Sequence, residues 1–144
     1  MPSPSTRQTQ MDTFMGKTAG LDSNKIIDDI AYTMRVEAKA DDYTVLASES
    51  GTVFVQTTAD CDFTLPTREA GLIYWFIGSS NHELRVTSDV TQKMTAFNDA
   101  AAAYVEFTTT GEQIGSGLLV YCDDGLFWNV CTMPGLVAST MGIA

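Results

Sequence analysis

The segment Leu118–Cys131, LLVYCDDGLFWNVC, decides the fold class. Two short apolar stretches flank the dipeptide Asp124-Gly125, and both of its residues tolerate positive φ. A two-residue type I′ turn at this dipeptide would join two antiparallel strands. The segment therefore predicts a β-hairpin.

A two-residue turn would fix the pairing of this hairpin, setting Cys122 opposite Phe127 and Leu118 opposite Cys131. The predicted first face carries Leu118, Val120, Cys122, Phe127, Asn129 and Cys131, and the second carries Leu119, Tyr121, Asp123, Leu126, Trp128 and Val130. The two cysteines would then share a face about 13 Å apart, at about 3.3 Å per residue, which is beyond disulfide reach. We expect free thiols.

Outward from the hairpin, the chain has a β character from Asp41 onward. Thr and Val are abundant, and turn residues recur about every ten positions, as in sandwiches and barrels. The candidate strands are Tyr43–Ala47, Thr52–Gln56, Asp62–Leu65, Leu72–Gly78, Glu83–Thr87, Lys93–Phe97, Tyr104–Thr109, Gly117–Cys122 and Phe127–Thr132. Ala100–Ala103 fits one helical turn or a loop. We predict a mainly β fold, an antiparallel β-sandwich or jelly-roll-like domain over residues 41–144.

Residues 1–40 differ in composition from this β-region. Residues 1–20 are rich in Pro, Ser, Thr, Gln and Gly and cannot offset their ordering entropy alone. We expect an extended N-terminal arm whose apolar anchors are Met11, Phe14 and Met15. Residues 22–39 form the connecting segment, where an approximate stripe of Ile and Met slightly favours a short helix over an extended chain.

The apolar residues of Leu72–Ile77 and of the hairpin occupy both faces of their predicted strands. An antiparallel sheet with one wet face would instead alternate apolar and polar residues. Burial in the core and contact between subunits explain this pattern equally well. The same two alternatives hold for the large aromatics Tyr74, Trp75, Tyr121 and Trp128. A sugar-stacking platform that also includes Tyr104 is a further, less favoured interpretation of these aromatics.

The charge balance excludes two classes of partner. The net charge is −10 and the isoelectric point about 4.2. Eight basic residues scattered singly cannot supply the counterion release that drives nucleic-acid binding, and an anionic membrane is an equally poor partner. Residues 1–27 carry a net +1 and the remaining residues a net −11, which predicts an acidic head and a near-neutral tail.

No catalytic or metal-binding constellation emerges from the sequence. His82, the single histidine, lies in a polar turn, and no GxSxG motif accompanies it. The cysteines Cys61, Cys122 and Cys131 do not have zinc spacing. Asp123-Asp124-Gly125 lacks the alternating ligands of a calcium loop. We expect no enzymatic activity, no cofactor and no metal.

Four segments of the β-region resemble a β-domain that recurs in tailed-bacteriophage virion proteins. They are Ser50–Phe54 (SGTVF), Phe63–Pro66 (FTLP), Ala70–Phe76 (AGLIYWF) and Gly125–Val130 (GLFWNV). In that domain a GTVF strand leads to a TLP strand end, then to an AGL segment, and a G-x-W-x-V strand closes the domain. The resemblance covers residues 50–130 in order and spacing, and it does not extend to residues 1–40.

The resemblance implies a head decoration (cement) protein. Such proteins commonly form homotrimers on the outer capsid and lock neighbouring major capsid protein subunits together, often through N-terminal arms. The partners expected are therefore the major capsid protein and further copies of the chain. The expected location is the outer surface of the virion, after synthesis in the host cytoplasm. A phage fibre or tail appendage that binds a host surface glycan is the alternative.

Overall fold

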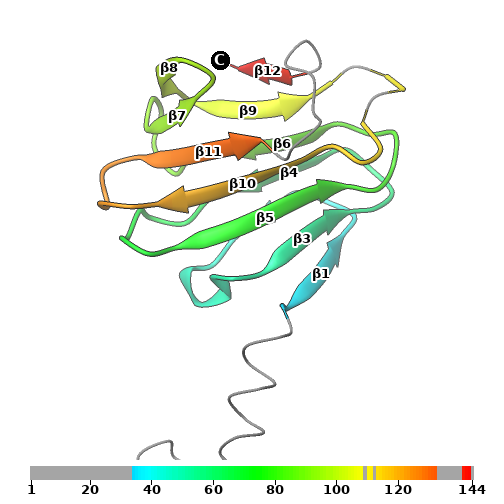
Figure 1. Ribbon diagram of the computed structural model, residues 1–144. Helices are drawn as coiled ribbons and strands as arrows, with labels where there is room; N and C mark the ends of the chain where they lie inside the picture. Colours follow the sequence, from blue (N-terminus) through cyan, green and yellow to red (C-terminus); the bar gives the residue numbers. More distant parts are fainter. Residues whose placement is uncertain (1–33, 109, 112, 133–140, 144) are drawn as a thin grey trace, which may run out of the picture. The chain divides into compact units, whose positions relative to one another are not determined.

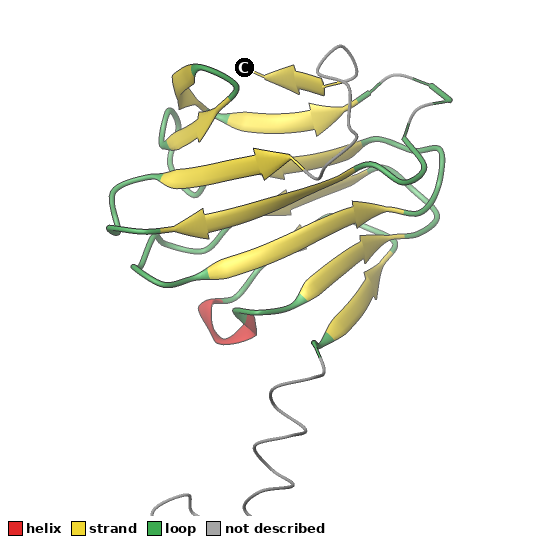
Figure 2. Cartoon of the chain, viewed as in Figure 1, coloured by secondary structure: helices red, strands yellow, loops and turns green. Residues whose placement is uncertain are grey.

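The computed structural model describes residues 34–108, 110–111, 113–132 and 141–143. The chain divides into the units Met1–Met34 and Arg35–Ala144, and every described strand belongs to the second unit. This unit is mainly β, with one short 3-10 helix, η1, among its described residues (Figure 2). Its elements are β1 (Val36–Lys39), β2 (Tyr43–Thr44), η1 (Ala47–Glu49), β3 (Val53–Gln56), β4 (Cys61–Thr64), β5 (Ile73–Gly78), β6 (Leu84–Thr87), β7 (Met94–Ala96), β8 (Asp99–Ala102), β9 (Tyr104–Phe107), β10 (Gly117–Cys122), β11 (Trp128–Thr132) and β12 (Met141–Ile143). The expected arm anchors Met11, Phe14 and Met15 lie outside the described residues, as does the expected helix up to residue 33.

The strands form two sheets. The seven-stranded sheet has the order β1-β3-β5-β10-β11-β7-β8, and the five-stranded sheet has the order β12-β9-β6-β4-β2. Figure 1 shows β5 and β10 in front of β4 and β6, so the sheets form two layers. Five of the ten strand pairs are parallel, so the expectation of an antiparallel domain is wrong for half of the pairing.

Four of the five parallel pairs arise because the first six strands alternate between the two sheets. β1, β3 and β5 are parallel neighbours in the seven-stranded sheet, and β2, β4 and β6 are parallel neighbours in the five-stranded sheet. Each connection within one sheet thus passes through a strand of the other sheet, which provides the crossover that parallel strands require. β10 then pairs with β5, and β9 pairs with β6. Both of these pairs are antiparallel, so the run of parallel strands ends there.

One core lies between the two sheets. In β5, buried residues alternate with partly exposed residues from Ile73 to Gly78, as the two-residue period of a strand requires. Phe54 of β3 stacks on Phe76 of β5, with 5.6 Å between ring centroids. Phe63 of β4 contacts both rings from the other sheet, at 5.8 Å and 5.0 Å. Aromatic packing therefore joins the two layers.

A buried carboxylate ends β2 earlier than the sequence predicts. The expected strand Tyr43–Ala47 stops at Thr44, and η1 follows. Glu49, which is 6% exposed, accepts hydrogen bonds from the Tyr43 hydroxyl at 2.8 Å and from the Leu46 N–H at 2.9 Å. These bonds turn the chain back on itself. The hydrogen bond to Glu49, followed by burial, raises the pKa of Tyr43.

A strand replaces the C-terminal end of the expected helix. β1 pairs in parallel with β3, and Val36 lies opposite Val53. Lys39 forms an ion pair with Glu37 at 2.9 Å and covers the ring of Tyr43, 3.6 Å from its centroid. Pairing with a neighbouring strand has overridden the local helical pattern. The first described strand therefore begins at Val36, ahead of the predicted start of the β-region at residue 41.

A second correction concerns Ala100–Ala103, for which the sequence indicates a helical turn or a loop. Residues 99–102 form β8, which pairs with β7 in an antiparallel arrangement. Phe97 and Asn98 connect the two strands with φ values of 47° and 70°. The two-residue turn with positive φ that sequence reasoning assigns to Asp124-Gly125 thus occurs at this connection instead.

The predicted hairpin forms as β10 and β11, but its register differs by one residue. Cys122 pairs with Trp128, and Leu118 pairs with Thr132. The loop accordingly holds five residues, Asp123–Phe127, instead of two. Within it, the Asp124 carboxylate accepts a hydrogen bond from the Leu126 N–H at 2.8 Å. A local side-chain bond of this kind favours the longer turn.

The one-residue shift moves every side chain of β11 to the opposite face from the one predicted. Trp128 points into the core and is fully buried, and Cys131 is exposed. Cys122 is buried, so the two cysteines lie on opposite faces of the hairpin, contrary to the predicted arrangement. All three cysteines are free thiols.

Candidate interaction surface

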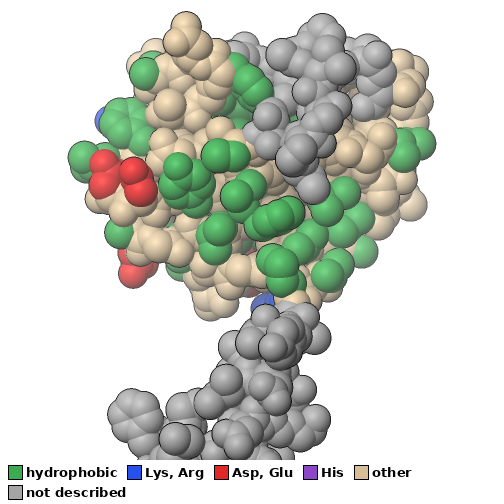
Figure 3. Space-filling model, in the orientation of Figure 1, with side chains coloured by type: hydrophobic (Ala, Val, Ile, Leu, Met, Phe, Trp, Pro, Cys, Tyr) green, Lys and Arg blue, Asp and Glu red, His purple; other side chains and the backbone are tan. Residues whose placement is uncertain are grey.

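The seven-stranded sheet has one face in the core and one face that points away from the five-stranded sheet. On β1, β3, β5, β10 and β11, the outward side chains are apolar with one amide among them, and no outward position of these five strands is Asp, Glu, Lys or Arg. We call this surface the apolar sheet face; its residues are Val36, Ala38, Val53, Val55, Ile73, Trp75, Ile77, Leu119, Tyr121, Asn129 and Cys131. Figure 3 shows hydrophobic side chains gathered over this face and acidic side chains at its margin.

The strand registers align these residues in rows across the sheet. The longest row contains Val36, Val53, Trp75, Leu119 and Cys131, one from each strand. Trp75 lies at its centre, with two strands on either side. Val36 is 64% exposed and Ile73 is 37% exposed, while Trp75 is partly exposed. A contiguous apolar patch of this kind marks a binding surface more often than scattered surface residues do.

The outward face of the five-stranded sheet has the opposite character. Arg85 forms ion pairs with Glu106 at 2.6 Å and Glu83 at 2.9 Å. The Thr87 hydroxyl donates a hydrogen bond to Asp62 at 2.7 Å. This face is therefore polar and carries charged residues, as expected for a sheet face in water. The two outer faces of one domain thus differ in what they can contact.

For four large aromatics, the sequence does not decide between burial in the core and a place on a contact surface. The structure divides them into two pairs. Tyr74 and Trp128 are fully buried, and their rings lie 6.0 Å apart. Trp75 and Tyr121 are partly exposed and belong to the apolar sheet face. One side of β5 therefore fills the core, and its other side forms part of the apolar sheet face.

Sequence reasoning missed the contribution of β1 and β3 to this surface. Val53 and Val55 alternate with the buried Phe54 and Gln56, so the segment VFVQ already has an apolar outward side. The signal for β1 was weaker, because the helical interpretation of residues 22–39 hid the alternation of Val36 and Ala38. Only the pairing of β1 with β3 brings these residues into the same surface.

One cysteine of the three is accessible at the apolar sheet face. Cys131 is exposed, whereas Cys61 and Cys122 are buried. Burial, reinforced by the carboxylates of Asp42, Asp41 and Asp60, raises the pKa of the Cys61 thiol. A thiol reagent will therefore react selectively with Cys131, which makes this residue a reporter of whether the face is covered.

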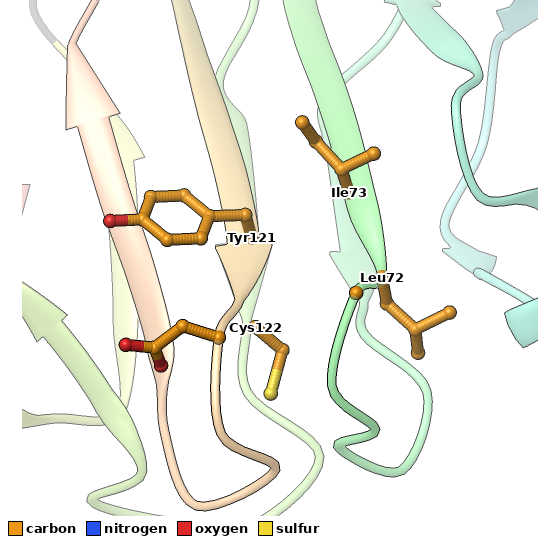
Figure 4. Close-up of a pocket in the computed structure, with 6 residues that line it drawn as sticks. Leu72, Ile73, Tyr121 and Cys122 are labelled. Carbon is orange, nitrogen blue, oxygen red and sulfur yellow. The ribbon is translucent and has the colours of Figure 1, made fainter.

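A shallow groove of about 320 Å³ opens at one end of this face, between the start of β5 and the end of β10 (Figure 4). It is lined by Gly71, Leu72, Ile73, Tyr121, Cys122 and Asp123. Figure 4 shows the Tyr121 ring extending from β10, with Ile73 on the neighbouring strand. Asn129 donates a hydrogen bond to the Asp123 carboxylate at 3.0 Å. The groove thus combines an aromatic ring with a carboxylate.

The histidine lies away from this surface. His82 is in the turn before β6, where its Nδ1 is 3.6 Å from the Asp60 carboxylate, and its side chain is 47% exposed. The same carboxylate accepts a hydrogen bond from the Glu83 N–H at 2.7 Å, so it stabilises the turn. Within the described part of the chain, no group of three or more His, Cys, Asp or Glu residues is placed to hold a metal ion.

Comparison with protein-family models and with curated proteins finds no match to this chain. Among the described residues, no helix has the length and apolar character needed to cross a bilayer.

Proposed function

We propose that the chain is a structural virion protein of a tailed bacteriophage, a capsid decoration protein built on a β-sandwich that acts through protein contacts rather than catalysis. The observation that carries the proposal is the apolar sheet face, which spans five strands without a charge. An uncharged surface of this extent is costly to leave in water, so it requires a partner. The sequence resemblance indicates that the partner belongs to the virion of a tailed bacteriophage.

The turn glycines of three resembling segments have a common structural role that supports the proposal. Gly51, Gly71 and Gly125 have φ values of 88°, 95° and 79°, a backbone region in which other residues are strained. Each of them precedes a strand of the seven-stranded sheet. The Gly51 N–H bonds to the Ile73 carbonyl at 2.7 Å, and the Gly71 N–H bonds to the Cys122 carbonyl at 2.8 Å. The recurring glycines therefore lie in turns that lead into strands of this sheet.

In the proposed function, the segment before β1 provides the capsid-binding arm, with Met11, Phe14 and Met15 as apolar anchors for the major capsid protein. The β-domain associates with further copies of the chain. The acidic surface of the domain repels other particles in solution. Several arms on one oligomer would bind the capsid with avidity, without any arm needing high affinity.

Cosedimentation with undecorated capsids tests this function. The full chain should bind such capsids, and deletion of residues 1–20 should abolish binding while circular dichroism still reports a folded β-domain. A variant with Met11, Phe14 and Met15 changed to Ser is the finer probe, because it keeps the length of the arm. Wild-type binding by both variants would refute the arm model.

The groove at Tyr121 favours the second candidate function, recognition of a host surface glycan by a fibre or tail appendage. Sugar rings stack on aromatic side chains, and their hydroxyl groups donate hydrogen bonds to carboxylates such as that of Asp123. Titration with mono- and oligosaccharides should then perturb the fluorescence of Trp75, and Tyr121→Ala should abolish the change.

Copy number on purified particles separates the two candidates. A decoration protein is present in numbers comparable to the major capsid protein, whereas a fibre or tail appendage is present in few copies. Quantitative mass spectrometry of the virion against the major capsid protein provides this ratio. A low ratio together with saturable sugar binding would favour the appendage.

A further inference from the structure

We propose that the apolar sheet face binds the same face of a second copy of this chain, so that two domains pair back to back around a two-fold axis. This inference rests on the proposed function in so far as both assign protein binding to the apolar sheet face, and it names the partner. Two-fold pairs use the same patch on both subunits, so the patch must be complementary to itself. A sheet face without charged side chains meets that condition.

The distribution of charge favours a second copy as the occupant. The chain carries a net charge of −10, so two copies repel each other unless their contact keeps the carboxylates apart. Acidic residues lie on the outward face of the five-stranded sheet, for example Glu83 and Glu106, and at the hairpin loop, Asp123 and Asp124. Back-to-back pairing buries the uncharged faces and leaves these groups in water.

The geometry of stacked sheets gives the separation between the two acidic faces. Stacked sheets lie about 10 Å apart, so the five-stranded sheets of a back-to-back pair would be about 30 Å from each other. At physiological ionic strength this is several times the screening length of about 8 Å. The repulsion between these two faces is therefore largely screened, whereas pairing through the five-stranded sheets would bring their carboxylates into contact.

The size of the face indicates how strong the pairing should be. Five strands at about 4.8 Å spacing and rows that extend over roughly 20 Å along the strands give a footprint of about 500 Å² per copy. Stable interfaces bury about 800 Å² per partner, so this contact belongs to the weak, concentration-dependent class. Trp75 at the centre of the longest row is the residue type and position typical of a binding hot spot.

Sedimentation equilibrium of the full chain over a wide concentration range tests the pairing. The mass should rise from 15.6 kDa towards twice that value as concentration increases. Higher salt should strengthen the association, because it screens the net charge and leaves the apolar contact unaffected. Trp75→Asp should raise the dissociation constant at least about tenfold, because one carboxylate from each copy would then be buried in an apolar contact.

Two further variants make this test independent of folding. Val36→Asp changes a residue that is 64% exposed, so it leaves the core intact, and it should also weaken the pairing. Thr44→Asp makes the same charge change at an exposed position of the five-stranded sheet, and it should leave the dissociation constant unchanged. The reaction of Cys131 with a thiol reagent should slow in wild type as pairs form, and it should stay fast in Val36→Asp.

A wild-type chain that stays monomeric at all concentrations, that assembles into trimers, or whose pairing is unaffected by Trp75→Asp and Val36→Asp would overturn the proposal. The proposed function fails separately. Paired chains that do not bind undecorated capsids would refute the capsid assignment and leave the pairing intact. Monomeric chains that still bind capsids would refute only the pairing.

Discussion

At the scale of single residues, the two tryptophans show that residues of the same type can lie on opposite faces of one sheet. Trp128 is fully buried, and its indole N–H donates a hydrogen bond to Asp89 at 3.2 Å. Trp75 is partly exposed on the apolar sheet face. The sequence offers the same alternatives for both residues, because both lie in strands with apolar residues on each side. Burial distinguishes them only after the sheets are packed.

We expect Trp128→Ala to lower the free energy of unfolding by about 3–5 kcal/mol, since it removes a large buried aromatic. Trp75→Ala should cost under about 2 kcal/mol in the monomer, because much less apolar area is lost. Urea denaturation followed by circular dichroism measures both values. Equal costs would contradict the assignment of Trp75 to the surface.

Gly78 is a position where the absence of a side chain matters. A Cβ atom added there would lie 2.7 Å from the Gln113 carbonyl oxygen and 2.7 Å from Ser116 Oγ. Gly78→Ala should therefore destabilise the domain by about 1–3 kcal/mol, the usual cost of overpacking. Adding Ser116→Ala removes one of the two clashes and should restore part of the loss. A thermal melt in which Gly78→Ala matches wild type would show that this close approach is absent.

Tyr74 predicts a loss of stability at alkaline pH. Burial, and then the carboxylates of Glu49 and Glu69, raise its pKa to about 12. Because the folded pKa exceeds the unfolded value of about 10, the folded state keeps this proton while the unfolded state loses it. Stability contributed by Tyr74 is therefore complete below pH of about 10 and is lost as pH rises towards about 12. Urea midpoints between these pH values should fall more in wild type than in Tyr74→Phe; parallel curves would contradict this origin.

At the scale of elements, the β10–β11 hairpin shows how a one-residue shift in register changes a surface. The apolar pattern identifies both strands, and the register depends on whether the loop holds two or five residues. With the five-residue loop, Trp128 enters the core and Cys131 joins the apolar sheet face. With two residues, Cys131 and Cys122 would share a face.

Thiol titration distinguishes these two registers. In dilute native protein, one thiol, Cys131, should react rapidly with an aromatic disulfide reagent, and all three should react after denaturation. Cys131→Ser should abolish the rapid phase, and Cys122→Ser should leave it unchanged. A rapid phase that survives Cys131→Ser would contradict the observed register.

At the scale of the whole molecule, the boundary between the two units lies at residues 34 and 35. The core and both sheets belong to residues 35–144, so we expect this segment to fold without residues 1–34. Its far-ultraviolet circular dichroism and urea midpoint should match those of the full chain. A segment that remains unfolded, or whose midpoint falls strongly, would show that residues 1–34 contribute to the β-domain.

The amino-acid sequence by itself determined the β character and the approximate position of most strands. These properties follow from local composition, alternation and turn residues. Only the tertiary structure decided that half of the strand pairs are parallel, that residues 36–39 form a strand, and which side of β11 enters the core. The physical reason is that alternation reports one buried side of a strand, whereas direction, register and the composition of a surface depend on neighbours distant in sequence. The apolar sheet face is such a property, since its five strands come from positions 36 to 131 of the chain.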